Sequence, residues 1–446
     1  MQSTEAVDDI LAIARQELLR IEDMIAQKKM NLQDIVDQTQ QCVNDVGCRF
    51  VEKMCEVVEQ EYSNNRPSNV VIKSKQTRRM LTAMGNIEIV RNQYYDKNNN
   101  CYFIAVDEAL NICRYSRIEN GLQAKILSDA ASSSFGVAAV RAGCSRQTAF
   151  NIVRRNKIEE NYEVINKPEG AFKTIYIEAD EDHIHLNDGR SAEVKLVYVH
   201  EGRKSVGKNR TVLMNAHYFS TLAPADEIWD RVAKYVAQQY GHNVYVHLSG
   251  DGAAWIKSGA EWFENVRYHL DKFHTYRSLT TASAGSKKEY IRLRNLLSEQ
   301  SYSAENELES IIQSAVLNGA DSSIRNNLIY LLNNYSKIDF SEKVACSAEG
   351  HVSHVLSKRM SSRPMGWSIA GAERIAQLRC FMYNGGNFLN LVIRTNRKTQ
   401  EKTVLTRHKA VVGGIETYRL PILEDKTSPA GSQIRRILAR NQKIIR

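Results

Sequence analysis

Acidic residues at the ends of two strand-like runs are the residues of this sequence best suited to chemistry. The run "KTIYIEADED" ends in Asp180 and Asp182, and the run "NVYVHLSGDG" places Asp251 between two glycines. The two-residue period of a strand puts Glu178, Asp180 and Asp182 on one face. If the two runs are neighbouring strands, Asp180 and Asp251 come within a few ångströms, and carboxylates that close repel unless a cation lies between them. Oxygen ligands without a Cys or His set favour Mg²⁺ or Mn²⁺ over zinc.

A third carboxylate is expected from a helix, because two-metal phosphoryl-transfer sites usually need one. The candidate is Glu349 in "CSAEGHVSHVLSKRMSSR", where helical spacing predicts that Glu349 faces inward beside Val352 and Leu356. Its rivals are Glu342 and Glu373. Taken singly, each of these acids could have a structural role only. An Asp between glycines is often a turn residue, and a Glu at the start of a helix is favoured by the helix dipole.

The elements around these acids occur in a specific order. Three strand-like runs, "KTIYIEAD", "AEVKLVYVH" and "RTVLMNAHYFS", precede a helix, "APADEIWDRVAKYVAQQYG", whose Ile228, Val232, Val236 and Ala237 face inward. The run that carries Asp251 follows as a fourth strand. A three-stranded meander, a helix and a returning strand is the order of the RNase H-like fold, in which the first and fourth strands are neighbours. A polar helical block then precedes Glu349.

A helix-turn-helix pattern precedes the strands. In "FGVAAVRAGCSRQTAFNIVRRN", Gly143 ends a short helix and Ser145 is a good N-cap for the next one. Basic and amide side chains lie along the second helix, as expected of a helix that enters the major groove of DNA: Arg146, Gln147, Arg154, Arg155 and Lys157. The alternative is an ordinary packed helical hairpin.

The remaining composition is that of a globular protein inside the cell. The 446 residues carry a net charge of +9, which favours polyanionic partners. Eight scattered cysteines form no zinc-ligand spacing, and neither a signal peptide nor a membrane-spanning run is recognisable. The amphipathic residues 5–62 predict helix, and "NIEIVRNQYY" and "CYFIAVDEA" predict two strands joined by the turn "DKNNN".

These patterns predict an α/β multi-domain protein with an RNase H-like core. The expected parts are an N-terminal helical region (1–63), a small β section (64–115), the helix-turn-helix region (116–165), the first part of the core (170–279), a helical insertion (280–343), the final part of the core (344–395) and a basic tail (396–446).

The chain resembles bacterial insertion-sequence transposases of the DDE type that carry a helical insertion before the catalytic Glu. The matching stretches are "IEADE", "SGDGAAWI", "LDKFH" and "AEGHVSHVLSKRMSSRPMGWS", and the resemblance covers most of the chain. It implies that Asp180, Asp251 and Glu349 are catalytic and hold two Mg²⁺ (or Mn²⁺) ions. It also implies that Asp271 and His274 form the D-x-x-H motif of that group.

The resemblance further implies a reaction and its partners. The enzyme would cleave double-stranded DNA at terminal inverted repeats and transfer the strand to a target DNA, acting in the bacterial cytoplasm, on the nucleoid, as a homodimer or larger complex. Phosphate contacts beside Glu349 are expected from Lys358, Arg359 and Arg363.

Several alternatives stay open at this point. Asp182 could replace Asp180 as a metal ligand, since both face the same side. His274 could orient substrate or be a buried structural His, and Trp255 and Trp262 could stack on a base or only pack in the core. Two other functions are also consistent with the sequence, namely a catalytically inactive DNA-binding protein descended from a transposase and an RNase H-like nuclease.

Overall fold

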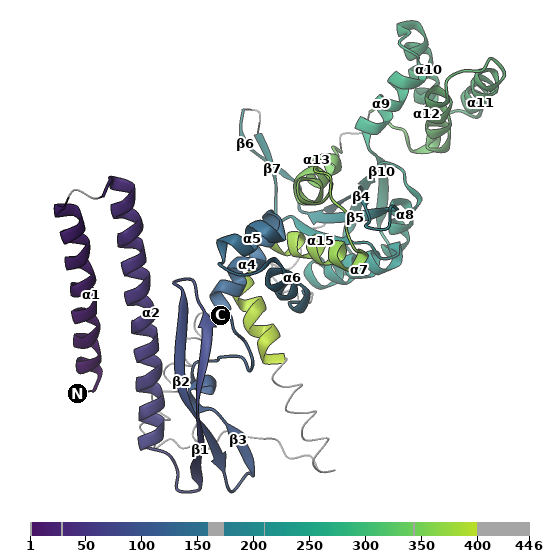
Figure 1. Ribbon diagram of the computed structural model, residues 1–446. Helices are drawn as coiled ribbons and strands as arrows, with labels where there is room; N and C mark the ends of the chain where they lie inside the picture. The colour runs from purple at the N-terminus through teal and green to yellow at the C-terminus, as the bar shows by residue number, and fades with distance from the viewer. Residues whose placement is uncertain (1, 28–29, 159–173, 209, 342–343, 399–446) are drawn as a thin grey trace. The chain divides into compact units, whose positions relative to one another are not determined.

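In the computed structural model, the described residues form a mixed α/β protein with three β-sheets (Figure 1). It describes residues 2–27, 30–158, 174–208, 210–341 and 344–398, so most of the predicted tail (396–446) lies outside it. The chain divides into two compact units: one comprises 1–130, 134–156 and 387–446, and the other comprises 131–133 and 157–386.

The first unit begins with two helices and a three-stranded sheet. The helical region is confirmed, but it forms two helices, α1 (Gln2–Ala26) and α2 (Leu32–Asn64), because Asn31 starts α2 with a capping box that it shares with Asp34. The sheet has the order β1-β2-β3, with β1 at Val70–Leu81, β2 at Asn86–Asp96 and β3 at Cys101–Phe103.

The β section departs from the prediction in two places. Strand β1 was not predicted, and "CYFIAVDEA" is a strand only in its first three residues, after which α3 (Ala105–Ala109) begins. The helix is favoured because it buries Val106 against α2 and the sheet. It also brings Asp107 to Arg78, at 2.9 Å, and to Arg91.

The predicted pair of helices between the β section and the core is confirmed. Helices α4 (Asn120–Ser132), α5 (Phe135–Arg141) and α6 (Arg146–Arg155) follow one another. Gly143 has the positive φ (62°) of a helix-ending glycine, and Ser145 Oγ accepts a hydrogen bond from Thr148 N at 3.1 Å, as an N-cap should.

The second unit is built on a five-stranded sheet with the order β10-β9-β4-β5-β8. In chain order its strands are β4 (Thr174–His185), β5 (Ser191–His200), β8 (His217–Thr221), β9 (Tyr245–Gly250) and β10 (Val266–Leu270). Strands β4, β5 and β8 form the predicted antiparallel meander, and β9 returns parallel to β4, as predicted for neighbouring first and fourth strands. Strand β10, parallel to β9, was not predicted.

The third predicted strand is divided. The run "RTVLMNAHYFS" supplies β7 (Arg210–Leu213), which pairs with β6 (Arg203–Gly207) in a separate hairpin, and then β8. Asn215, which lies between them, has φ 49°, a left-handed conformation that a continuous strand does not allow.

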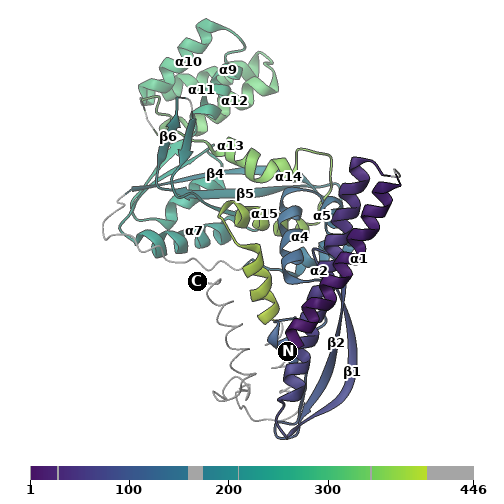
Figure 2. The same cartoon turned by 90° about the vertical axis from the view of Figure 1, so that its left-hand side faces the viewer.

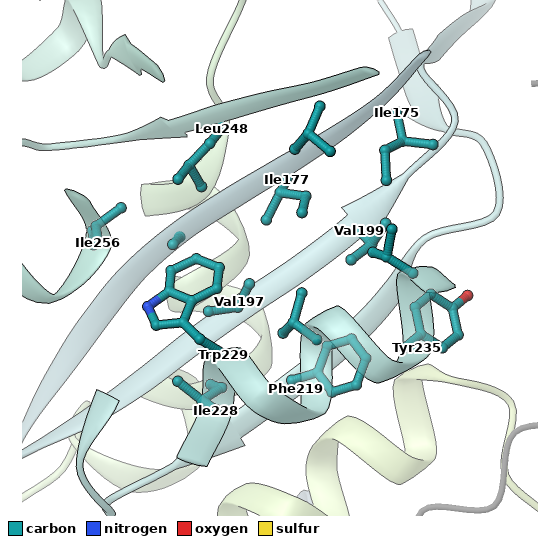
Figure 3. Packing of buried hydrophobic residues seen from close by; sticks show 14 of the residues in the cluster. Ile175, Ile177, Val197, Val199, Phe219, Ile228, Trp229, Tyr235, Leu248 and Ile256 are labelled. Atoms are coloured by element: carbon teal, nitrogen blue, oxygen red, sulfur yellow. The ribbon is translucent and has the colours of Figure 1, made fainter. Parts of the chain in front are cut away.

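Helix α7 (Ala225–Tyr240) covers one face of the five-stranded sheet. Figure 3 shows Ile175 and Ile177 of β4 meeting Ile228 and Trp229 of α7, all fully buried. Because side chains alternate along β4, the burial of its isoleucines turns Glu178, Asp180 and Asp182 to the opposite face.

The predicted insertion is entirely helical where it is described. It comprises α9 (Lys272–Ala282), α10 (Lys287–Glu299), α11 (Tyr302–Leu317), α12 (Ser322–Asn333) and a short 3₁₀ turn, η2 (Tyr335–Lys337). It has its own core, in which Leu279, Leu293, Leu297 and Leu308 are buried, and it begins at α9, earlier than the predicted residue 280.

Short helices complete the second unit. Helix α8 (Ala254–Lys257) and the 3₁₀ turn η1 (Ser258–Trp262) follow β9. After the insertion come α13 (Ala348–Val352), a π-helical turn η3 (Ser353–Ser357), α14 (Lys358–Met360) and α15 (Ile369–Tyr383). Across the described ranges, none of the helices combines the length and the apolar character that crossing a membrane requires.

A glycine beside α7 tests this packing. A side chain added at Gly259 would overlap the indole of Trp229, which is fully buried. We expect Gly259→Ala to lower the free energy of unfolding by about 1–3 kcal/mol, because the core must shift to admit the methyl group. Gly350→Ala is the matched control, since it adds a methyl group to open space on a helix and should be neutral or stabilising. Equal destabilisation by both, measured by denaturant unfolding, would contradict the packing of η1 on α7.

Candidate active site

Three carboxylates follow one another across three neighbouring parallel strands. The register of β4 and β9 pairs Glu178 with Ser249, so its continuation by two residues sets Asp180 opposite Asp251. Strand β10 ends level with β9, and the next residue, Asp271, stands beside Asp251. The hydrogen bond from Asp271 N to Gly250 O, at 2.7 Å, continues this pairing beyond the last strand residue. The sheet therefore gathers Asp180, Asp251 and Asp271 where β9 and β10 reach their carboxyl ends, beside the middle of β4. We call this end of the sheet the acidic edge.

The electrostatics of the acidic edge show how close these charges are. Burial raises the pKa of Asp180 to about 7; a hydrogen bond from Glu181 N opposes the shift, and the charges of Asp251, Glu181 and Asp271 add to it. Burial also raises the pKa of Asp271, and the charge of Glu349 acts in the same direction. When neighbouring carboxyl groups disfavour one another's ionisation, a bound cation stabilises their charged forms strongly.

The two glycines beside Asp251 are required by close contacts. A Cβ at Gly250 would lie 2.7 Å from Ile256 Cγ2 and 3.1 Å from Ala179 O, so β9 could not approach β4 with a larger residue. Gly252 has φ +97°, and a Cβ there would lie 2.6 Å from Asn334 Oδ1. Asp251 Oδ1 accepts a hydrogen bond from Ala253 N at 2.9 Å, so Asp251 is a turn residue as well as a member of the acidic edge.

The helical insertion holds the Asp251 turn. Tyr330 of α12 donates its hydroxyl to Asp251 O at 2.6 Å, and the buried Asn334 packs against Gly252. Neither contact was predicted, because a Tyr and an Asn in an amphipathic helix carry no sequence signal for this role.

Asp271 and His274 lie together, as expected for the D-x-x-H stretch. Asp271 is buried and caps α9 by accepting a hydrogen bond from Phe273 N at 3.0 Å. The Nε2 atom of the half-buried His274 lies 3.8 Å from Asp271 Oδ2. His274, in the first turn of α9, therefore lies beside the acidic edge through its contact with Asp271.

Glu349 differs from the prediction, because it does not face inward. Val352, Val355 and Leu356 form the predicted buried stripe, whereas Glu349, in the first turn of α13, is exposed. Burial is the main cause of the raised pKa of Asp271, and the charge of Glu349 adds to it. Within the described ranges, no three His, Cys, Asp or Glu side chains converge closely enough to share one ion.

The rivals of these acids have other surroundings. Glu373 accepts hydrogen bonds from Thr221 Oγ1 (3.0 Å) and Leu222 N (2.6 Å), so it fastens α15 to the end of β8. Glu342 lies outside the described residues.

Asp182, the alternative to Asp180, is buried and accepts a hydrogen bond from Ser361 Oγ at 2.9 Å. Burial raises the pKa of Asp182, and its contacts with serines lower it, so it serves the packing beyond α14.

A buried carboxylate that sequence reasoning missed fixes the segment before Glu349. Glu178 accepts hydrogen bonds from Tyr198 Oη (2.6 Å), His200 Nε2 (2.9 Å), Arg203 (2.8 Å) and Ser347, through its backbone N–H and its Oγ (3.1 Å). Burial alone would raise the pKa of Glu178, but the hydrogen bonds from His200 and Tyr198 outweigh it and lower the pKa to about 2. Since Ser347 precedes α13, this Glu178 cluster ties the re-entering chain to β4.

Trp255 has a defined structural position. Its indole N–H donates to Glu181 Oε2 at 2.8 Å, and its ring packs against the core that contains Trp229. The packing role is therefore observed, and it places the Trp255 ring next to the strand segment that carries Asp180.

The basic residues expected beside Glu349 divide into two kinds. Lys358 and Arg363 are exposed, as phosphate contacts must be. Arg359 is buried, with its guanidinium 5.1 Å from the ring centroid of Trp367, and burial next to Arg379 lowers its pKa to about 10. Arg359 therefore lacks the exposure that a phosphate contact requires in the described structure, and its contact with DNA stays a prediction.

The predicted DNA-reading residues keep most of the expected exposure. Arg146, Gln147 and Arg154 are exposed on α6. Arg155 donates to the side chain of the buried Gln123 on α4, so it supports the packing of the unit. Lys157, two residues beyond α6, is exposed.

Comparison with known proteins gives a family without an assigned activity. The model of a family described as "Uncharacterised protein family (UPF0236)" matches residues 25–398. The UPF0236 protein TTE2489 of Caldanaerobacter subterraneus subsp. tengcongensis is 33% identical over 387 residues, covering 83% of each chain. Another UPF0236 protein of that organism, whose name joins eleven locus labels from TTE0033 to TTE2212, is 32% identical over 386 residues, covering 83% of this chain and 82% of its own.

The acidic edge predicts a pH-dependent and metal-dependent stability. Because the pKa of Asp180 is raised from 3.8 to about 7, its ionisation costs the folded protein stability, and that cost grows as the pH rises from about 4 to 7. Asp180→Asn should therefore become more stable than the wild type across this window, by about 1–2 kcal/mol.

The same variant tests whether the acids hold a cation. Mn²⁺ at pH 8 should raise the thermal unfolding midpoint of the wild type but not that of Asp180→Asn, since an ion that binds only the folded state stabilises it. Asp188→Asn, which removes an exposed acid paired with Arg190, should keep the wild-type response. A response of equal size in all three proteins would show that the ion binds elsewhere.

Proposed function

We propose that this chain, which belongs to the uncharacterised protein family UPF0236, is a metal-dependent DNA transposase that cleaves the ends of a mobile element and joins them to target DNA. The observation that carries the proposal is the acidic edge, where β4, β9 and β10 gather Asp180, Asp251 and Asp271. Burial raises the pKa of Asp180, and the neighbouring charges add to the shift. Such an edge suits a phosphoryl-transfer site, because divalent cations neutralise both its carboxylates and the DNA phosphates.

The sheet order supports an RNase H-like core. In chain order the strands lie third, second, first, fourth and fifth, with the first three antiparallel and the last two parallel to the first. The helical block between Asp271 and Glu349 matches the insertion of the DDE transposases that the sequence resembles.

The residues at the acidic edge fit Mg²⁺ or Mn²⁺. Carboxylate oxygens are the ligands that these hard cations prefer, and Asp180, with no side-chain donor among its described contacts, is better placed to hold an ion than Asp182, which Ser361 engages. Asp180 and Asp251, set opposite each other on neighbouring strands, would hold an ion from the sheet. Glu349, exposed on α13, does not converge with these two acids in the described structure and would have to move toward them to complete the ligand set. Two bound ions would activate the attacking water or 3′-OH and stabilise the leaving oxygen.

The other residues would position these groups. The Glu178 cluster fixes the chain at Ser347, two residues before Glu349, and the Tyr330 hydroxyl fixes the backbone at Asp251. Asp271, held as the cap of α9, would orient His274 toward the phosphate or the attacking hydroxyl. Exposed Lys358 lies on the helix that follows Glu349 and would contact the DNA backbone.

The names of the relatives favour a mobile element over a resident nuclease. One relative's name joins eleven locus labels and another's joins four, all in one organism. A protein encoded at many loci of one genome is expected of an element that inserts itself repeatedly, whereas a repair or processing nuclease has no need of such multiplicity. Applied to this chain, that multiplicity supports strand transfer in addition to cleavage.

Strand chemistry at an element end tests the proposal directly. With Mg²⁺, the wild type should nick a labelled duplex of the terminal inverted repeat and join it to a target plasmid. Asp251→Asn should lower both rates at least ~10³-fold while duplex binding is retained, because the metal loses a ligand. Asp188→Asn, which removes an exposed acid paired with Arg190 in the turn between β4 and β5, should react like the wild type.

The same assay separates the alternatives. Nicking without joining would assign a nuclease, and duplex binding with no cleavage in Mg²⁺ or Mn²⁺ would assign a DNA-binding protein without catalysis. Either result would overturn the transposase assignment.

DNA recognition by α6 gives a second test. Because Arg146 and Gln147 are exposed at the start of a capped helix, Arg146→Ala/Gln147→Ala should weaken binding to the element end by roughly tenfold or more and reduce discrimination against a scrambled duplex. Arg141→Ala is the control, since Arg141 lies on α5 and pairs with Asp129. Fluorescence anisotropy at fixed salt measures both, and equal losses in the two variants would exclude α6 as the reading helix.

A further inference from the structure

Helices α1 and α2 each carry an exposed stripe of large apolar side chains. On each helix the three members are seven residues apart and between 42% and 60% exposed: Leu11, Leu18 and Ile25 on α1, and Val36, Val43 and Phe50 on α2. A seven-residue spacing keeps side chains on one side of a helix, as in the seams of helical bundles. Solvent-exposed seams of this kind need a partner.

The two stripes lie on the same side of the helix pair. The helices lie side by side and antiparallel (Figures 1 and 2). Ile21 of α1 and Cys42 of α2 are buried, and we take them to mark the side on which each helix faces the other. At 100° per residue, the α1 stripe is rotated by about 60° from Ile21, and the α2 stripe is rotated in the same sense by about 100° from Cys42. Because the helices run in opposite directions, rotations in the same sense bring both stripes to one side. They form a single two-helix face, which we call the apolar face.

We propose that the apolar face is a dimer interface that binds the same face of a second copy of this chain. The charges on α1 select this occupant. Arg15 and Glu22 lie between the members of the α1 stripe, one on each side of Leu18. When α1 packs antiparallel on itself with the two-fold axis at Leu18, Arg15 lies beside the partner's Glu22 and Glu22 beside the partner's Arg15. Leu11 then meets the partner's Ile25.

Other pairings do not use these charges. Parallel packing would set Arg15 against the partner's Arg15 and Glu22 against the partner's Glu22, which is unfavourable. The residues between the members of the α2 stripe, such as Thr39, Gln40 and Val46, are uncharged, so α2 accepts its own copy without repulsion. A face that is complementary to itself under a two-fold rotation is the signature of an isologous dimer.

The apolar face is large enough for a stable contact. A 25-residue helix is about 37 Å long, and two such helices facing their copies form an antiparallel four-helix bundle. Six half-exposed side chains per copy, with their flanking residues, bury on the order of 1,000 Å² in total, which reaches the range of specific interfaces. The inference does not rest on the proposed enzymatic activity, although a dimer would suit a protein that joins two element ends.

Two exposed apolar residues of α1 give a matched test in the full chain. Leu18 and Ile13 are 54% and 40% exposed, but Ile13 points about 140° away from Leu18, toward the opposite side of α1. Sedimentation equilibrium over a concentration series should show a dimer for the wild type. Leu18→Asp should raise the dissociation constant at least ~100-fold, because two facing carboxylates would be buried at the axis, and Ile13→Asp should change it less than ~3-fold. A monomeric wild type, or equal effects of the two variants, would overturn the proposal.

Charge reversal tests the orientation without removing an apolar group. Arg15→Glu and Glu22→Arg should each weaken the dimer roughly tenfold, since each creates like-charge contacts across the axis. The double variant should recover wild-type affinity, which a merely misfolded helix could not do. Arg20→Glu, rotated toward the opposite side of α1, is the control and should leave the dimer unchanged. Failure of the double variant to recover would overturn the antiparallel pairing.

Discussion

The parallel pairing of β4 with β9 is the constraint on which the candidate site depends. Because side chains alternate along a strand, a slip of one residue would turn Asp180 into the core and expose the isoleucines beside it. Ile175 and Ile177 are fully buried against α7, so the hydrophobic core fixes the register. The same register sets Asp180 opposite Asp251. Apolar burial on one face of the sheet thus determines where the charges stand on the other.

Two acids on the same face of β4 have opposite environments. Glu178 is surrounded by donors from Tyr198, His200, Arg203 and Ser347, and its pKa falls to about 2. Asp180, two residues further along, accepts one described hydrogen bond, from the backbone of Glu181, and its pKa rises to about 7. The charge of Glu178 is therefore satisfied within the fold and serves the structure. The charge of Asp180 is not, and this difference separates a positioning residue from a candidate ligand.

The sequence predicted the elements that have strong local patterns. The meander, α7, β9 and the capped α6 are confirmed, because their periodicity and caps are local properties. Strand β10 was missed since "VRYHL" is short and does not alternate clearly. Helical spacing does not reveal tertiary contacts. It therefore could not predict the outward position of Glu349 or the burial of Arg359 against Trp367. Asp271 was predicted only as a supporting residue, because its place in the acidic edge follows from β10.

The insertion has a structural reason to be where it is. It has its own core, yet α9 begins at Asp271 of the acidic edge, and α12 returns to hold Asp251 through Tyr330. Asn334, at the end of α12, is buried against Gly252, so the turn between β9 and α8 cannot move without disturbing the insertion. An acidic edge whose charges repel would otherwise open at its least constrained point, and that point is the glycine-flanked turn. The insertion therefore holds the carboxylates together against their own repulsion.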